Sequence, residues 1–248
     1  MVDINALKSS CGNCSLTELC LPRGLNQGEV EKLDALVKRR RPLQRGESLF
    51  QSGDPFHSLF AVRSGSLKTM VFANDGSEKV LGFHLAGELV GMDAIGDDKH
   101  HCAAVALETT GVCEVAFQEL GHLSRHVPGL QHQLLRLAGQ EINNDQQMLL
   151  MLGNHGAEQR LATFLWSLGS RLADRGFSRH EFNLTMSRHD IANYLGLAME
   201  TVSRLFTHMH KEGLLQVRRR HITITNPEGL RSLVHLCADS VSTFRDKD

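Results

Sequence analysis

The sequence predicts an α+β fold in which a small antiparallel β domain, a long helix and a winged helix-turn-helix follow one another along the chain. Three observations predict it. Between Pro42 and Phe117, short β-like runs are separated by glycines at turn spacing. From Val127 to Gly153, apolar residues recur at the spacing of a helical seam. Between Ser187 and Glu212, two short helical patterns flank a turn glycine, Gly196.

The composition is that of a globular protein. Hydrophobic residues make up 41% and charged residues 22% of the 248 residues, which suits one large or two ordinary domains. The first ten residues lack the apolar run of a signal peptide, and no stretch reaches the roughly 18 apolar residues that would span a membrane. We therefore expect a cytoplasmic protein without a membrane partner. Its six cysteines are then expected to bind a metal or sense redox state, not to form structural disulfides.

The same patterns divide the chain into four segments. Residues 1–24 form a cysteine-rich segment, and residues 25–126 form a β domain that opens with a short amphipathic helix from Leu25 to Arg40. Residues 127–154 form the long helix, and residues 155–248 form the helix-turn-helix domain. From His155 onward the chain carries a net positive charge, whereas the part before it is net negative. This asymmetry indicates that the C-terminal domain faces a polyanion.

The cysteine-rich segment contains three cysteines with metal-ligand spacing, Cys11-x2-Cys14-x5-Cys20. Thiolates this close in sequence can converge on one soft metal centre, for which a fourth ligand is needed. The candidates for that ligand are Cys102, Cys113 and Cys237. Cys113 lies in an alternating, strand-like run, although a lone cysteine there could also be a small buried hydrophobe. The spacing is compatible with a structural zinc site (a zinc brace), with an iron–sulfur cluster or with a thiol–disulfide switch.

The long helix opens at Pro128, which suits a first helical turn because its missing N–H costs nothing there. Six positions follow the alternating three- and four-residue steps of a coiled-coil seam: Leu135, Ala138, Ile142, Asp145, Leu149 and Leu152. In a symmetric parallel dimer each position faces its own copy, so two Asp145 carboxylates would repel each other against the apolar contacts. We therefore predict a dimer that forms conditionally. The alternative is an amphipathic helix that is buried within the chain, with Asp145 at its solvent-exposed edge.

The helix-turn-helix pattern predicts a protein that binds double-stranded DNA. Ser187 can cap a first helix that ends near Leu195, and a second helix runs from about Met199 to Glu212. Three arginines then precede an alternating stretch within residues 216–225, which predicts a β-hairpin wing whose positive charges lie near phosphates.

The exposed start of the second helix carries the candidate base readers. Glu200 can accept a hydrogen bond from cytosine N4, Arg204 can donate two hydrogen bonds to guanine, and Ser203 can reach a base edge. Thr201 and Arg188 are better placed for phosphates.

Three motifs carry a resemblance to a known family. They are Cys11-x2-Cys14-x5-Cys20 with Cys113, the run Gly-Phe-His-Leu-Ala-Gly-Glu-Leu over residues 82–89, and Glu-Thr-Val-Ser-Arg over residues 200–204. With these motifs the chain resembles, from about Cys11 to Thr225, the FNR branch of the CRP/FNR superfamily of transcription factors. The members of that branch are oxygen-responsive regulators of anaerobic metabolism. The resemblance implies that the β domain is a cyclic-nucleotide-binding-like β-roll. It also implies that Cys11, Cys14, Cys20 and Cys113 hold a [4Fe–4S] cluster in the absence of oxygen.

The resemblance further implies a regulator that is a homodimer when loaded with the cluster and in monomer–dimer equilibrium otherwise. The dimer would read palindromic TTGAT-type sites through Glu200, Ser203 and Arg204, contact RNA polymerase, and activate or repress anaerobic-metabolism genes. We expect no enzyme, because the sequence has no G-x-G-x-x-G fingerprint, flavin signature or nucleophile–base set. The alternatives are a regulator of the same fold with a zinc or thiol–disulfide switch and, less expected, an iron–sulfur redox protein.

The roll is not expected to bind a cyclic nucleotide. In the nucleotide-binding members of the superfamily an Arg-Ser pair holds the cyclic phosphate. The corresponding region here reads Lys99-His100-His101-Cys102-Ala103, and a lysine or histidine lacks the planar fork of arginine. The two adjacent histidines are expected to be solvated loop residues.

Overall fold

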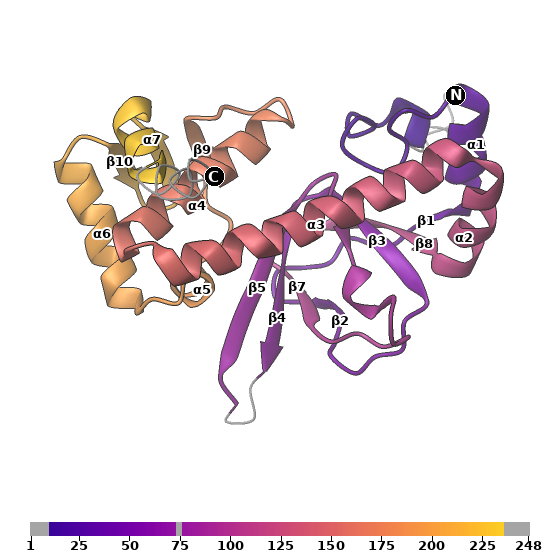
Figure 1. The fold of residues 1–248 in the computed structure, drawn as a ribbon, viewed down its shortest axis with the longest axis horizontal. Helices are drawn as coiled ribbons and strands as arrows, with labels where there is room; N and C mark the ends of the chain where they lie inside the picture. The colour runs from indigo at the N-terminus through magenta and orange to yellow at the C-terminus, as the bar shows by residue number, and fades with distance from the viewer. Residues whose placement is uncertain (1–9, 73–75, 236–248) are drawn as a thin grey trace, which may run out of the picture. The chain divides into compact units, whose positions relative to one another are not determined.

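The computed structural model describes residues 10–72 and 76–235, and the chain separates into two compact units. The first unit comprises Met1–Ser77 and Leu81–Ile142, and the second comprises Glu78–Val80 and Asn143–Asp248. The predicted β domain, long helix and winged helix-turn-helix are all present, so the α+β fold class is confirmed (Figure 1).

The first unit is built on two four-stranded sheets, with strand orders β1-β8-β3-β6 and β2-β7-β4-β5. Its strands are β1 (Val37–Arg39), β2 (Ser48–Phe50), β3 (Ser58–Ser64), β4 (Ser66–Phe72), β5 (Glu78–Leu85), β6 (Leu89–Val90), β7 (Ala103–Ala106) and β8 (Gly111–Ala116). The buried apolar side chains of these strands form the core of the roll. At the β3–β4 turn the backbone φ of Gly65 is +77°, and a Cβ there would lie 2.6 Å from the Thr109 carbonyl oxygen, so this turn requires glycine.

The helices of the first unit cover one end of the roll. Helix α1 (Gln27–Leu36) begins at a capping box in which Asn26 and Glu29 satisfy each other's backbone N–H groups. The prediction that this helix reaches Arg40 is wrong, because Val37–Arg39 leave the helix as strand β1 and pair with β8. Short 3₁₀ turns cover Cys11–Asn13 (η2) and Met92–Ala94 (η3).

Helices α2 (Phe117–His126) and α3 (Pro128–Asn154) follow the last strand of the roll. The predicted start of the long helix at Pro128 is confirmed. Val127 and Leu130 are fully buried at its beginning, in the same core as Leu33 of α1 and Val115 of β8. The first part of α3 is therefore fixed to the roll by apolar packing.

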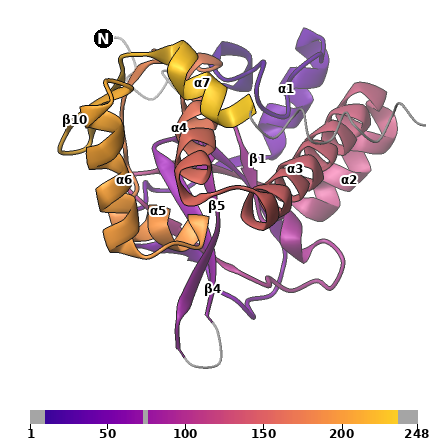
Figure 2. The same cartoon turned by 60° about the vertical axis from the view of Figure 1, so that its left-hand side comes forward.

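The second unit holds the winged helix-turn-helix (Figure 2). Its elements are α4 (Ala157–Ala173), β9 (Glu181–Asn183), α5 (Arg188–Leu195), α6 (Met199–Lys211), β10 (Leu215–Arg218), β11 (His221–Ile224) and α7 (Pro227–His235). Ser187 caps α5 through the N–H of Asp190, and Gly196 ends it in a left-handed conformation, which confirms the predicted cap and turn. The predicted wing is the hairpin β10–β11, which β9 extends to three strands.

Among the described residues, none of the helices combines the length and the apolar character needed to cross a lipid bilayer.

Candidate metal centre and nucleic-acid interface

Four cysteines from separate parts of the first unit line one small cavity of about 40 Å³. Cys11 lies in η2, Cys14 and Cys20 follow in the next turns, and Cys113 lies on strand β8. The remaining walls are largely apolar and include Leu21, Leu33 and Val115. All four thiols are free. The fold thus brings the N-terminal trio to a cysteine that lies about ninety residues further along the chain.

Side chains of the neighbouring elements hold the backbone of the cysteine segment. Asp34 on α1 accepts the Cys11 N–H at 2.9 Å and pairs with Arg39 at 2.6 Å. Thr17 donates its hydroxyl proton to the carbonyl oxygens of Cys11 (3.0 Å) and Cys14 (2.7 Å). Gln133 on α3 donates to the Cys20 carbonyl oxygen at 2.8 Å. The backbone is therefore anchored at the first and the last of the three cysteines.

The surroundings of Cys11, Cys20 and Cys113 favour the neutral thiol. Burial raises the pKa of Cys11 and of Cys20 to about 12. Asp34 raises the pKa of Cys11 further, and neighbouring cysteines raise the pKa of both, although a hydrogen bond with the Leu21 backbone opposes the shift at Cys20. Burial also raises the pKa of Cys113, although Arg63 and Arg39 oppose it. The thiols of Cys11, Cys20 and Cys113, whose raised pKa disfavours the free thiolate, can carry negative charge if a bound cation replaces their protons.

This donor set fits a soft metal centre, either zinc or an iron–sulfur cluster. Among residues 10–72 and 76–235, however, no three His, Cys, Asp or Glu side chains are already arranged as metal ligands. A bound group would therefore have to draw the sulfur atoms closer together.

The other two candidate ligands are not at this cavity. Cys102 is 4% exposed and packs in a different core cluster, where its thiol hydrogen-bonds the Asp93 carboxylate at 3.4 Å. Cys237 lies outside the described residues.

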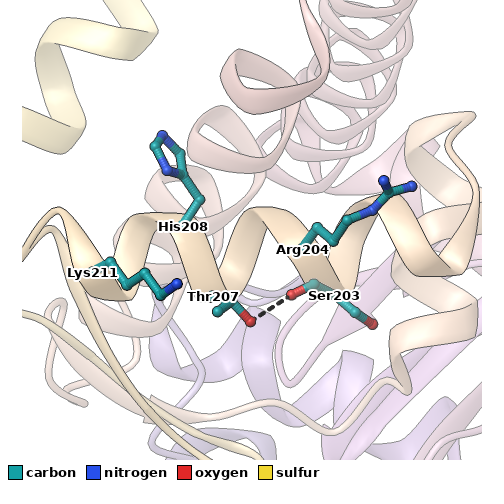
Figure 3. Close-up of a pocket in the computed structure, with 5 residues that line it drawn as sticks. All are labelled: Ser203, Arg204, Thr207, His208 and Lys211. Carbon is teal, nitrogen blue, oxygen red and sulfur yellow. Dashed lines mark hydrogen bonds between the residues drawn. The ribbon is translucent and has the colours of Figure 1, made fainter.

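The exposed face of α6 carries the candidate base readers, two of which, Ser203 and Arg204, are drawn in Figure 3. Val202, Phe206 and Met209 are buried on the opposite face. A shallow surface hollow is lined by Ser203, Arg204, Thr207, His208 and Lys211. Glu200 is exposed one turn earlier and Thr201 is half-buried. The structure thus gathers the predicted residues of α6 on one outward face.

Sequence reasoning missed three residues of this face. Thr207, His208 and Lys211 follow Ser203 and Arg204 at helical spacing, so the i+3 and i+4 rule could have found them. Thr207 donates its hydroxyl proton to the Ser203 carbonyl oxygen at 3.1 Å, and His208 lies 3.4 Å from Glu158 on α4. Lys211 extends the positive charge of the face.

Arg188 is placed differently from the other candidates. Its guanidinium lies over the Phe206 ring, 3.3 Å from the centroid, and its Nη1 atom is buried without a hydrogen-bond partner. Burial lowers the pKa of Arg188 to about 10, so the group remains charged at neutral pH. Its suggested phosphate contact stays a prediction.

Half of the predicted seam on α3 is strongly exposed. The exposed fractions of Leu135, Ile142 and Leu149 are 67%, 59% and 70%. Asp145 is also exposed, whereas Ala138 and Leu152 are half-buried. The alternative of a helix buried within the chain is therefore wrong for these leucines and isoleucine. Exposed large apolar side chains at seven-residue spacing are typical of an interaction surface.

The sequence matches two known domain families. Residues 40–126 match the cyclic nucleotide-binding domain, and residues 159–233 match the Crp-like helix-turn-helix domain. The fumarate and nitrate reduction regulatory proteins of Salmonella typhimurium and Escherichia coli K12 are each 48% identical to this chain over 223 residues. These residues are 90% of this chain and 89% of each relative. This chain belongs to the FNR family of CRP/FNR transcriptional regulators.

Solved structures agree with this membership. FixK2 from Bradyrhizobium japonicum superposes with a TM-score of 0.73 at 28% identity, covering 79% of this chain and 96% of FixK2. A CooA variant from Carboxydothermus hydrogenoformans superposes with a TM-score of 0.67 at 19% identity, over 88% of this chain and 95% of CooA, and so supports the fold alone. The FNR-type chain is a DNA-binding transcriptional regulator, and its relatives are regulators, not enzymes.

In this FNR-type roll, the backbone at residues 101–102 is hydrogen-bonded by a carboxylate of the chain itself. The Asp93 carboxylate accepts the backbone N–H groups of His101 (2.8 Å) and Cys102 (3.3 Å). His100 is 3% exposed and stacks on Phe50 with ring centroids 3.7 Å apart. The expectation of a solvated side chain is therefore wrong for His100, although His101 is exposed. Because the negatively charged Asp93 carboxylate already accepts the N–H groups of His101 and Cys102, a phosphate group at the same place would be repelled.

Proposed function

We propose that this FNR-type regulator responds to oxygen through a [4Fe–4S] cluster held by Cys11, Cys14, Cys20 and Cys113. One observation carries the proposal: the four thiols line a single cavity, with largely apolar walls, at the base of α3. Cysteine thiolates are the usual ligands of such clusters, and apolar walls limit the access of solvent. When bound, the cluster would supply a covalent link between the N-terminal segment and β8 that oxygen can break.

The chain's own residues would convert that link into dimerisation. The cysteine segment packs against the beginning of α3, where Cys20 and Cys113 contact the core that contains Leu130. Further along the helix, Leu135 and Ile142 offer apolar contacts to a second copy, whereas Asp145 opposes pairing. A free-energy change of a few kcal/mol in favour of dimerisation would move the chain from mostly monomer to mostly dimer.

Dimerisation would place two copies of α6 about one DNA turn apart. We propose that Glu200, Ser203 and Arg204 then read the two halves of a TTGAT-type palindrome and that Thr201 and Arg188 contact phosphates. In this proposal the dimer works in the cytoplasm, contacts RNA polymerase, and activates or represses anaerobic-metabolism genes, without a cyclic nucleotide. The domain boundaries near residues 24, 126 and 154 belong to the same proposal.

The test is a metal and sulfide analysis of protein purified without oxygen. We expect about four iron and four sulfide per chain and a visible absorbance band. Cys113→Ser should lose most of both, and the matched control Cys102→Ser should keep them, since Cys102 lies in another core cluster. DNA binding of the loaded wild type should fall on exposure to air. Stoichiometric zinc without sulfide would contradict the proposal and favour the zinc brace, because four cysteines also suit a structural zinc site.

A further inference from the structure

A buried amide joins the cysteine segment to the long helix. Gln133 lies on α3, is 3% exposed, and donates from Nε2 to the Cys20 carbonyl oxygen at 2.8 Å. Its Oε1 accepts from Nε of Arg136 at 2.8 Å. Both ends of the amide are therefore satisfied, which is what a buried polar side chain requires.

Packing alone does not explain a glutamine at this position. Leu130 is buried on the same helix, and Leu134 and Leu137 pack, as Cys20 does, against the core that contains Leu130. An apolar residue at position 133 could fill the same space without the cost of burying an amide. The specific property of Gln133 is that it bonds the backbone of a cysteine at the cavity.

The position of Gln133 on the helix gives that bond a consequence. Successive residues of an α-helix are rotated by about 100°, so Gln133 and Leu135 point to nearly opposite sides of α3. Gln133 faces the cysteine segment, and Leu135 is 67% exposed on the other side. Cys11, the first of the three cysteines, is held by α1 and not by α3, since Asp34 on α1 accepts the Cys11 N–H.

We propose that Gln133 is a positioning residue that couples the state of the cysteine cavity to the seam of α3. Drawing Cys20 toward the other three sulfur atoms moves its carbonyl group, and the hydrogen bond obliges α3 to follow, because a broken bond would leave a buried amide unsatisfied. When the side of α3 that carries Gln133 moves, Leu135 and the seam residues beyond it change position relative to a second copy of the chain. This inference rests on the proposed function, because it assumes that a bound group draws the thiols together.

The test separates coupling from folding and from cluster binding. Gln133→Leu removes the hydrogen bond at similar volume, and Gln140→Leu is the matched control, an exposed glutamine two turns further along α3. Both are loaded with iron and sulfide without oxygen, and their dimer dissociation constants are measured by sedimentation and compared at equal iron content. We expect Gln133→Leu to bind iron as the wild type does but to dimerise about tenfold more weakly, which is about 1.4 kcal/mol. Gln140→Leu should behave as the wild type.

A second variant keeps the test decisive. If Asp145→Ala makes the iron-free chain dimerise, Asp145→Ala/Gln133→Leu should dimerise equally well without iron, because the coupling is bypassed. Failure of this double variant to dimerise would overturn the proposal, since Gln133 would then be needed for the helix itself. Equal dimerisation of loaded Gln133→Leu and loaded wild type would also overturn it, as would loss of iron binding. Wild-type protein that binds no iron and no sulfide would instead count against the proposed function.

Discussion

The guanidinium carbon of Arg188 lies 3.3 Å from the centroid of the Phe206 ring, so a cation–π contact joins the first residue of α5 to the middle of α6. This contact therefore contributes to the packing of the two helices of the DNA-reading motif. A desolvated cation–π pair contributes up to about 2 kcal/mol. Arg188 is therefore a structural residue of the helix-turn-helix in addition to any contact that it makes with DNA.

We predict that Arg188→Ala lowers the free energy of unfolding of the second unit by about 1–2 kcal/mol. Urea unfolding followed by the fluorescence of Trp166 on α4, the single tryptophan, would measure it. Arg218→Ala in the exposed wing is the control and should leave stability unchanged. If Arg188→Ala were fully stable but bound all DNA sequences more weakly, the residue would serve only as a phosphate contact.

We predict that Arg204→Ala weakens binding to a TTGAT-type palindrome by about 1–3 kcal/mol per half-site and relaxes the preference at one base pair. The reason is the loss of two hydrogen bonds to guanine. Fluorescence anisotropy with the consensus site and with a site changed at that base pair would measure both effects.

Lys211→Ala is the companion variant, because Lys211 lines the same face of α6 at a greater distance from the helix start. It should weaken binding to every sequence alike. It should also make the slope of log K against the logarithm of the salt concentration shallower by about one. Uniform weakening by Arg204→Ala as well would show that Arg204 contacts phosphate and reads no base.

The parts of this fold with local signals could be predicted from the sequence. Ser187 and Gly196 mark the boundaries of α5 because a cap and a left-handed turn depend only on neighbouring residues. Pro128 marks the start of α3 for the same reason. Within the candidate site, the spacing of Cys11, Cys14 and Cys20 is likewise local.

Features that depend on distant partners could not be predicted. Val37–Arg39 continue an amphipathic pattern, and only the pairing with β8 makes them a strand. The burial of His100, which precedes strand β7, depends on Phe50, which lies on strand β2. Gln133 resembles any polar residue of a helix until its partner, the Cys20 carbonyl 113 residues away, is known. Long-range packing of this kind overrides local propensity.

We predict that the thiol of Cys102 is unreactive in the folded protein. Burial and the adjacent Asp93 raise its pKa from 9.0 to about 12, which lowers the thiolate fraction near pH 8 by about a thousandfold. Iodoacetamide labelling with peptide mass spectrometry, with and without urea, would measure it. Equal labelling of Cys102 in the native and the unfolded chain would contradict the prediction.

The same shift gives a pH dependence of stability. The folded state holds the proton of the Cys102 thiol more tightly than the unfolded state does. The protonated thiol therefore contributes fully to the free energy of unfolding below about pH 9, and this contribution is lost as the pH rises toward 12. Cys102→Ala should therefore flatten the loss of stability between about pH 9 and 11. Urea unfolding of the wild type and the variant over this range would show the difference, and parallel curves would contradict the assignment.

We predict that Asp145→Ala makes the iron-free protein dimerise in air. In a symmetric dimer the two carboxylates face each other, and like unit charges about 4 Å apart repel by about 1–4 kcal/mol, depending on their hydration. Removing them leaves the apolar contacts of Leu135, Ile142 and Leu149 unopposed. Sedimentation velocity would measure the change, with Asn144→Ala as the control, because Asn144 is exposed next to the seam without belonging to it. Asp145→Glu should stay monomeric since the charge is kept. An iron-free Asp145→Ala protein that remains monomeric at the concentrations at which the loaded wild type pairs would show that the charge at position 145 does not control dimerisation.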